Sequence, residues 1–319
     1  MRCLILLLSA VAAFCAGPLD WIEARGGAVT RDAQSRVTGI RIDLAWVTDG
    51  DIASLAELPH LKTLDLSFTL ITDAALEQLS PLRGIEHLNL QSAELLTDAA
   101  IAHIRGWKQL RSLQLRGTDI TDTSMEYIAE LPALERLDVS YTQITNNGME
   151  YLAGLNRMED LSIGGNKISG VGLHILKSLP RLKRLNLSGA QKRNSGTWGT
   201  ALTEADMGTI AALAQLEALN LAGVRLTNSG LARLRSLVRL KELDLSKTQV
   251  GAAALDTLQS MAAMERLSLW KTAGIDDSAV PALGALKGLK LLDAAETKLS
   301  EAGAAALRKA LPQCQVLWR

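Results

Sequence analysis

A segment of about 24 residues recurs along most of the chain, and this internal repeat limits the possible folds more than any other feature. Each copy carries apolar residues at its first, fourth, sixth, eleventh, sixteenth, nineteenth and twenty-second positions. The repeats begin at Val37, Leu61, Ile85, Leu110, Leu134, Met158, Leu182, Leu216, Leu240, Met264 and Leu289. Such a unit can bury its apolar residues only against its neighbours, so the sequence predicts eleven stacked repeats in a solenoid.

Each repeat contains a short strand, a turn and a short helix. The opening LxxLxL pattern alternates between buried and exposed positions, which is typical of a strand. The ninth position holds a small hydrogen-bonding residue that can satisfy the backbone of the turn; examples are Thr69, Thr118, Thr142, Asn166, Thr248, Thr272 and Thr297. Thr-Asp pairs follow, and their residue types favour helix N-termini; examples are Thr72-Asp73, Thr97-Asp98 and Thr121-Asp122.

With this pattern the chain resembles leucine-rich repeat proteins over residues 37–312. The threonine at the ninth position and the ITDxxLxxL helix start are similar to the bacterial and F-box-associated subclass. The resemblance implies an α/β solenoid, a curved horseshoe with a parallel sheet on its concave face and short helices on its convex face. It also implies a non-catalytic protein-binding scaffold, but no particular partner.

The ends of the chain indicate export and capping. Arg2, the apolar run from Leu4 to Phe14 and the small residues after it predict a signal peptide at 1–17, and hence a secreted or periplasmic protein; an uncleaved anchor is the alternative. We assign 18–36 to an N-terminal cap, 37–312 to the solenoid and 313–319 to a C-terminal cap strand. Trp21 and Trp318 are expected to cover the two ends of the core.

The charge balance and the motifs exclude several functions. Lysine plus arginine and aspartate plus glutamate number 34 each, so a nucleic acid is not expected as the main partner. No phosphate-binding or dinucleotide-binding glycine pattern occurs, and we predict no cofactor. The histidines are too far apart in the predicted solenoid to share a metal ion; they are His60, His87, His103 and His174. The oligomeric state stays open.

The outward-facing strand residues at the third and fifth positions should line the concave face. Arg136, Asp160 and Arg184 alternate in charge along neighbouring strands, as do Glu242 and Arg266. A polar, mixed surface of this kind suits a protein or peptide ligand, and we include the first three residues in the predicted binding site. The alternative is that these charges simply satisfy one another, with exposed pairs contributing about 0–1 kcal/mol each.

One step between repeats, from Leu182 to Leu216, is 34 residues long. We place its surplus at 191–200, QKRNSGTWGT, just after the ninth position, where added chain would project from the rim of the sheet. Aromatic and basic residues dominate binding hot spots, so a partner-contacting patch is predicted here; its members are Lys192, Arg193, Trp198, Tyr141, Trp270 and Lys271. The alternative is a tolerated insertion whose Trp198 packs back onto the solenoid.

Two other functions compete with that of a scaffold. Asp65, His87 and Ser112 occupy successive strands and could be read as a hydrolytic triad, although no oxyanion hole is apparent. A carbohydrate-binding envelope protein is also compatible with polar amides beside aromatic residues. We predict that the protein is not an enzyme.

Overall fold

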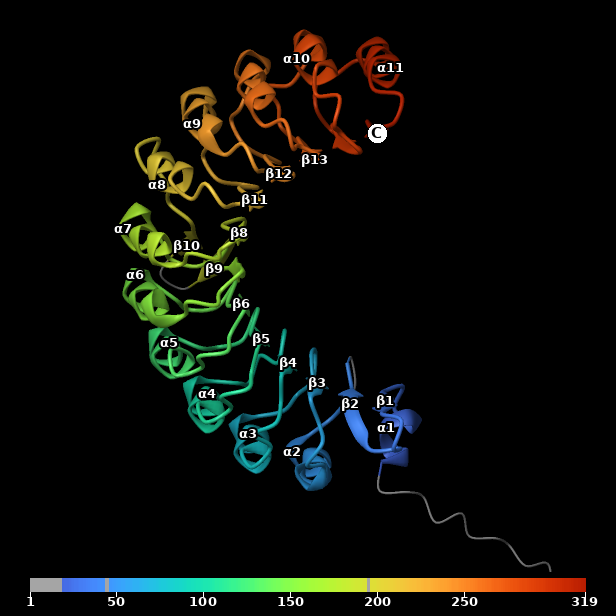
Figure 1. The fold of residues 1–319 in the computed structure, drawn as a ribbon, viewed down its shortest axis with the longest axis vertical. Helices are drawn as coiled ribbons and strands as arrows, with labels where there is room; N and C mark the ends of the chain where they lie inside the picture. The colour runs from blue at the N-terminus through green and yellow to red at the C-terminus, as the bar shows by residue number, and fades with distance from the viewer. Residues whose placement is uncertain (1–18, 44–45, 194–195) are drawn as a thin grey trace, which may run out of the picture.

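The computed structural model describes residues 19–43, 46–193 and 196–319, and the predicted signal peptide lies outside them. These residues form a continuous arc, with strands along its inner side and helices along its outer side (Figure 1). The described residues contain one 13-stranded sheet and a separate two-stranded sheet. The predicted α/β solenoid with a parallel sheet on the concave face is confirmed.

The elements alternate along the chain in the order strand, turn and helix. The strands of the large sheet are β1 (Ala28–Arg31), β2 (Val37–Arg41), β3 (Thr63–Asp65), β4 (His87–Asn89), β5 (Ser112–Gln114), β6 (Arg136–Asp138), β7 (Asp160–Ser162), β8 (Arg184–Asn186), β11 (Ala218–Asn220), β12 (Glu242–Asp244), β13 (Arg266–Ser268), β14 (Leu291–Asp293) and β15 (Gln315–Leu317). The small sheet comprises β9 (Ala190–Arg193) and β10 (Gly196–Gly199).

Apart from α1, which lies beside β1 at the N-terminal end, the helices are short and stack side by side on the convex face (Figure 1). The α-helices are α1 (Asp20–Ala24), α2 (Asp49–Ile52), α3 (Asp73–Leu79), α4 (Asp98–Ile104), α5 (Asp122–Ile128), α6 (Asn146–Met149), α7 (Gly170–Leu173), α8 (Met207–Ala211), α9 (Asn228–Arg233), α10 (Val280–Gly284) and α11 (Glu301–Ala310). The 3-10 helices are η1 (Ala53–Glu57), η2 (Glu150–Gly154), η3 (His174–Ser178), η4 (Leu234–Ser236), η5 (Ala252–Ser260) and η6 (Asp277–Ala279).

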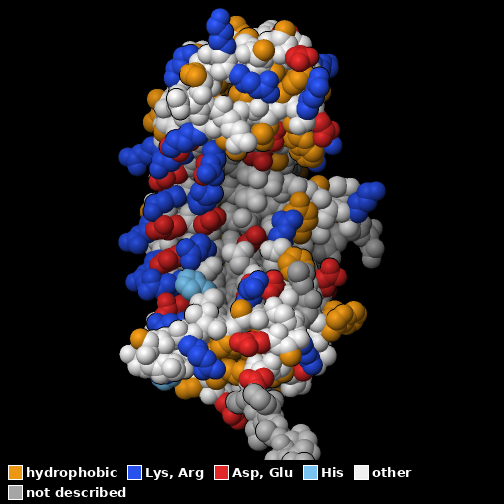
Figure 2. Space-filling view, turned by 90° about the vertical axis from the view of Figure 1, so that its right-hand side faces the viewer, with side chains coloured by type: hydrophobic (Ala, Val, Ile, Leu, Met, Phe, Trp, Pro, Cys, Tyr) orange, Lys and Arg blue, Asp and Glu red, His pale blue; other side chains and the backbone are white. Residues whose placement is uncertain are grey.

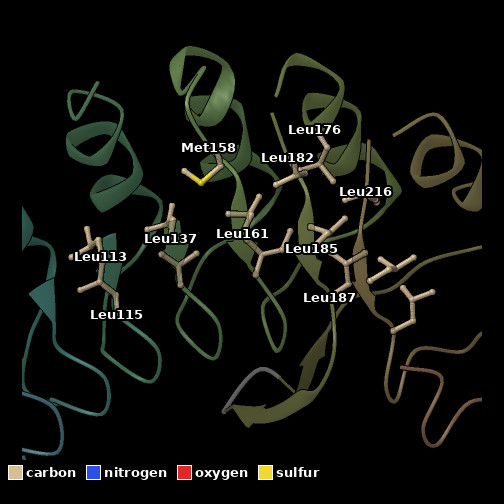
Figure 3. Packing of buried hydrophobic residues seen from close by; sticks show 14 of the residues in the cluster. Leu113, Leu115, Leu137, Met158, Leu161, Leu176, Leu182, Leu185, Leu187 and Leu216 are labelled. Carbon is tan, nitrogen blue, oxygen red and sulfur yellow. The ribbon is translucent and has the colours of Figure 1, made fainter. Parts of the chain in front are cut away.

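The strands pair in register, so equivalent positions of successive repeats lie side by side. Strand β1 is antiparallel to β2, and the later neighbours in the large sheet are parallel. Leucines at the fourth position stack along the inside of the sheet, where Leu113, Leu137, Leu161 and Leu185 are buried between strands and helices (Figure 3). The core is therefore one elongated layer shared by all the repeats.

The ninth-position residues bond the turn backbone, as the sequence predicted. The hydroxyl of Thr69 donates to the carbonyl oxygen of Leu66 at 2.6 Å, and Thr118 does the same to Leu115 at 2.7 Å. Both threonines are buried. Because a carbonyl group buried without a partner is costly, this hydroxyl stabilises the exit from the strand in the repeats that carry it.

On the helix side, aspartates connect five of the repeats to the repeat that follows. The side chain of Asp73 accepts hydrogen bonds from the backbone N–H of Thr97 at 2.8 Å and from its hydroxyl at 2.6 Å. The hydroxyl of Thr97 in turn caps α4 by accepting from the N–H of Ala99. The same carboxylate-to-cap contact recurs in four further pairs: Asp49–Thr72, Asp98–Thr121, Asp122–Thr145 and Asp277–Ser300. The predicted caps thus also connect neighbouring repeats.

Replacing Asp98 with alanine should lower the free energy of unfolding by about 2 kcal/mol. Its carboxylate accepts from the N–H and hydroxyl groups of both Thr121 and Ser124, so the variant leaves partly buried donors unpaired. Denaturant unfolding monitored by circular dichroism measures the change. Asp256 is an exposed helical aspartate and serves as the control, with an expected change within about 0.5 kcal/mol. Equal destabilisation by both substitutions would contradict the proposed connection.

The two terminal tryptophans pack against the ends of the core. Trp21 and Trp318 are partly buried, and the indole N–H of Trp318 donates to the carbonyl oxygen of Leu299 at 2.7 Å. Strand β1 lies beyond β2 at one edge of the sheet, and β15 lies at the other edge. Across the described residues, no helix has the length and apolar character needed to cross a membrane.

Candidate partner-binding surfaces

The fifth-position side chains on the concave face support the turns of their own repeats. The Oδ1 atom of Asp244 accepts from the backbone N–H of Ser246 at 2.9 Å, and Asp293 accepts from Ala295 at 3.0 Å. The same contact is made by Asp65, Asn89, Asp138, Asn186 and Asn220. Sequence reasoning treated these residues only as surface, although an Asx residue two positions before a turn N–H is a recognisable signal.

The predicted charged row at the third position is brought together by β6, β7 and β8. Arg184 Nε lies 3.4 Å from Asp160 Oδ2, and its Nη2 reaches across the small Ala218 to Glu242 Oε2 at 3.3 Å. Burial raises the pKa of the Asp160 carboxyl above its usual value, while Arg184 and Arg136 oppose that shift. These residues form one electrostatically coupled row.

A hollow of about 530 Å³ covers the concave face from β7 to β15. Its lining combines the ion pairs around Arg184 with amide and hydroxyl groups on the fifth positions and with apolar residues, of which Leu291 and Leu317 lie at the C-terminal end. Leu317 is exposed. The hollow therefore offers hydrogen-bonding, charged and apolar contacts on the same surface.

A second charge ladder, which sequence reasoning missed, follows the second positions of the repeats. Lysines or arginines alternate with glutamates over most of its length, and one edge of the face shows alternating blue and red side chains (Figure 2). Its close pairs are Lys62–Glu86, Arg111–Glu135, Lys183–Glu159, Lys241–Glu217 and Lys290–Glu265, at 2.6–3.4 Å. The signal was present as opposite charges one repeat apart. Such exposed pairs contribute about 0–1 kcal/mol each.

The insertion is a β-hairpin, with β9 antiparallel to β10, and it begins one residue earlier than predicted. Thr200 was counted within 191–200, but its hydroxyl donates to the carbonyl oxygen of Leu187 at 2.8 Å, which is the bond made by the ninth position elsewhere. The extra residues are therefore 190–199. They enter before the ninth position, not after it, because the turn still needs its buried hydroxyl.

The hairpin is fastened to the two preceding repeats. The side-chain amide of Gln191 donates to the carbonyl oxygens of Thr142 at 2.7 Å and Gly165 at 2.8 Å. The ring of Tyr141 extends across Gly165 and Gly189, where a β-carbon would lie within 3 Å of the tyrosine side chain. The guanidinium of Arg116 lies 4.1 Å from the ring centre. Tyr141 therefore supports the base of the hairpin and is only partly available to a partner.

The residues of the predicted rim patch fall into two groups. Tyr141 and Lys192 line one groove of about 380 Å³, and the ring of Trp198 lies 5.8 Å from the Nζ of Lys167. The side chain of Arg193 lies outside the described part of the structure.

The second group surrounds Trp270, whose ring lies 4.4 Å from Lys247 Nζ and 4.5 Å from Lys271 Nζ. Its indole N–H donates to Glu296 Oε1 at 3.0 Å. A hydrogen bond from Lys271 is the main cause that lowers the pKa of the Glu296 carboxyl. Trp270 and Lys271 are thus held together within three adjoining repeats, whereas the hairpin leans toward the opposite, N-terminal side.

The eighth position adopts a left-handed backbone throughout the repeats from Leu61 onward. Glycine fills it at Gly117, Gly165, Gly189 and Gly223, whereas the other repeats use Phe68, Ser92, Tyr141, Lys247, Lys271 and Glu296, with φ between 53° and 58°. A side chain in this conformation costs about 1–2 kcal/mol. Three of these side chains take part in contacts with an aromatic ring. The ring of Tyr141 lies against Arg116, Lys271 lies against the ring of Trp270, and Glu296 accepts from the indole N–H of Trp270.

The geometry does not favour a hydrolytic triad. Asp65 Oδ1 accepts from the N–H and hydroxyl groups of Ser67, and Ser112 is buried. His87 pairs with Thr63 and Ser112 across the sheet, while Asp65 pairs with Asn89. Within the described residues, no group of three or more His, Cys, Asp or Glu side chains is arranged to hold a metal ion.

The fold and its surfaces define a class, a curved repeat solenoid that exposes one long sheet face and its rims. Family models described as Leucine rich repeat match residues 108–168 and 132–191, and a further model of that description matches residues 57–80. The chain is a leucine-rich repeat protein. Among curated proteins, none matches this sequence significantly.

Solved structures share the architecture. An internalin (inlF) from Listeria monocytogenes str. 4b F2365 superposes with a TM-score of 0.57 at 17% identity, over 88% of this chain and 86% of the internalin chain. A structure described as a TDR receptor gives a TM-score of 0.54 at 17% identity, over 85% of this chain and 45% of the receptor chain. At this level of identity, the likeness concerns the fold alone.

Proposed function

We propose that this protein is a non-catalytic scaffold that binds a protein or peptide along its concave face and rim. The observation that carries the proposal is the open 530 Å³ hollow, in which charged, amide and apolar side chains line one continuous surface. An extended polypeptide offers the same variety of groups, whereas a small apolar ligand would leave the charges unpaired. The repeat family, which commonly supplies binding surfaces, supports this choice.

We further propose that the protein acts outside the cytoplasm, after removal of a signal peptide at about 1–17. The charged start, apolar run and small residues of the N-terminus support export. We retain 18–36 and 313–319 as caps and the similarity to the bacterial and F-box-associated subclass as parts of the same proposal. N-terminal sequencing of the chain recovered from its native compartment tests the cleavage site, and an intact Met1 would contradict it.

Affinity capture with the mature chain tests the scaffold function. The bait starts at residue 18, and bound proteins are identified by mass spectrometry. A matched bait carries Arg184→Ala and Glu242→Ala, which remove the central ion pair of the hollow together and leave the net charge unchanged. The proposal expects a protein retained by the first bait and depleted about tenfold or more from the second. Retention of nothing, or equal retention by both, would contradict concave-face binding.

Deleting residues 190–199 tests the hairpin, because it places Thr200 directly after Gly189, at the ninth position of the repeat. Thr200 is kept because its hydroxyl completes the turn, so the melting temperature should fall by only a few degrees. Capture of the partner is expected to weaken about tenfold or more if the hairpin contributes a hot spot. Deleting 191–200 provides the comparison, since it leaves Ala190 at the ninth position in place of Thr200 and should destabilise the fold further. Unchanged capture would exclude the hairpin from the binding surface.

A further inference from the structure

Large apolar side chains are exposed at the N-terminal end of the rim from which the hairpin arises. Trp46 is 85% exposed, Leu95 52%, Leu70 49% and Phe68 46%. We call these four residues the N-terminal rim patch. They lie between the eighth and eleventh positions of three consecutive repeats, and they are half of the eight large apolar residues that are exposed in the described chain. Apolar side chains gathered on one edge of a protein indicate an interaction site.

The backbone at Phe68 is an independent indication that this edge is used. Phe68 has a φ of 57° at the position that four other repeats fill with glycine. At Tyr141 the same conformation lets the ring pack beneath Arg116, but the ring of Phe68 remains nearly half exposed. Phe68 presents a half-exposed aromatic side chain from this strained conformation, which supports a contact outside the chain.

Acidic side chains lie next to the N-terminal rim patch. Glu94 precedes Leu95, and Glu94 and Asp119 line the groove that Lys192 and Tyr141 close on the hairpin side. Asp119 also accepts a hydrogen bond from the amide of Gln143 at 2.6 Å. The rim therefore passes from apolar side chains to two carboxylates within adjoining repeats.

We propose that the N-terminal rim patch binds a polypeptide segment that carries apolar side chains followed by a lysine or arginine. The apolar residues cover Trp46, Phe68 and Leu70, and the cation pairs with the exposed Glu94, which lines the adjoining groove. This inference rests on the proposed scaffold function and specifies a second surface for it. The two carboxylates would repel an anionic lipid surface, so a polypeptide is the favoured occupant.

Two labelled peptides test the proposal. One is a short fluorescein-labelled peptide of leucine followed by lysine residues, and the other has glutamate in place of every lysine. Fluorescence anisotropy with the mature chain is expected to show saturable binding of the lysine peptide, and binding of the glutamate peptide weaker by about tenfold or more. Phe68→Gly together with Leu70→Ser should weaken the lysine peptide about tenfold or more. Phe68→Gly alone should melt no lower than the wild type, because glycine relieves the left-handed strain.

The control is Val171→Ala. Val171 lies in α7 on the helix side and is 72% exposed, so shortening its side chain should leave peptide affinity unchanged. The proposal would be wrong if the wild type bound both peptides equally. It would also be wrong if the wild type and the rim variant bound the lysine peptide equally. Absence of binding would overturn it as well. If the lysine peptide bound the rim variant normally but not the Arg184→Ala, Glu242→Ala variant, its binding site would lie on the concave face, and the proposed scaffold function would still hold. Sedimentation with phosphatidylglycerol vesicles that depends on Phe68, without peptide binding, would assign the patch to a lipid surface instead.

Discussion

Replacing Trp107 with alanine is expected to lower the free energy of unfolding by about 3–5 kcal/mol. The side chain is fully buried, and its indole N–H donates to the carbonyl oxygen of Ser80 in the preceding repeat at 3.3 Å. It fills a place where other repeats have leucine, such as Leu131 and Leu155. Alanine would therefore leave a cavity larger than a neighbouring side chain can close, together with an unpaired carbonyl group.

Guanidinium unfolding of the purified variant measures this loss, with a lower midpoint and an unchanged slope. Trp46→Ala is the matched control, because the same side chain is 85% exposed there and its removal should change stability by at most about 0.5 kcal/mol. The contrast separates burial from the chemistry of tryptophan. If the two variants unfolded at the same denaturant concentration, the assignment of Trp107 to the core would be wrong.

Asn166 should be nearly as sensitive, and Asn166→Ala is expected to cost about 3 kcal/mol. The side chain is fully buried and serves two repeats at once. Its amide group donates to the carbonyl oxygens of Val139 at 2.7 Å and Ile163 at 3.1 Å, and its Oδ1 atom accepts from the N–H groups of Thr142 and Ile144. Alanine would leave these buried groups without the bonds that Asn166 provides.

Asn166→Thr is the informative comparison. In several other repeats, a threonine at the ninth position donates to one carbonyl group of its own repeat, as Thr118 does to Leu115. The threonine variant should therefore recover about half of the stability lost in the alanine variant. Thermal unfolding by calorimetry compares the two. Equal melting temperatures for alanine and threonine would show that the bonds of Asn166 between repeats matter more than the turn bond.

Sequence reasoning could predict the solenoid because its signal is repeated and local. Leucines at the fourth position stack in register, Thr69 bonds the turn and Thr97 caps a helix, and each of these follows from residue type and spacing alone. The same reasoning could not show that Asp73 reaches into the next repeat, since that contact depends on how far adjacent helices lie from each other. Stacking geometry is a property of pairs of repeats.

The candidate surfaces were less accessible to sequence reasoning. The pattern placed Arg136, Asp160 and Arg184 side by side, but it did not show that Arg184 reaches Glu242 across Ala218. The length of the step between repeats indicates the insertion, yet a run of ten residues, nearly all polar or small, carries no signal for the direction in which a hairpin leans. That direction depends on Gln191 and on the space left by two glycines beside Tyr141.

The aspartate contacts on the convex face have a mechanical consequence. Each of these carboxylates bonds the repeat immediately after its own, at the first four junctions between repeats and at the last one. A slight rotation at every junction adds up over the length of the arc, and the distance between its tips can change by many ångströms without breaking any one bond. The solenoid should therefore be able to widen or narrow the opening of its arc to fit ligands of different size.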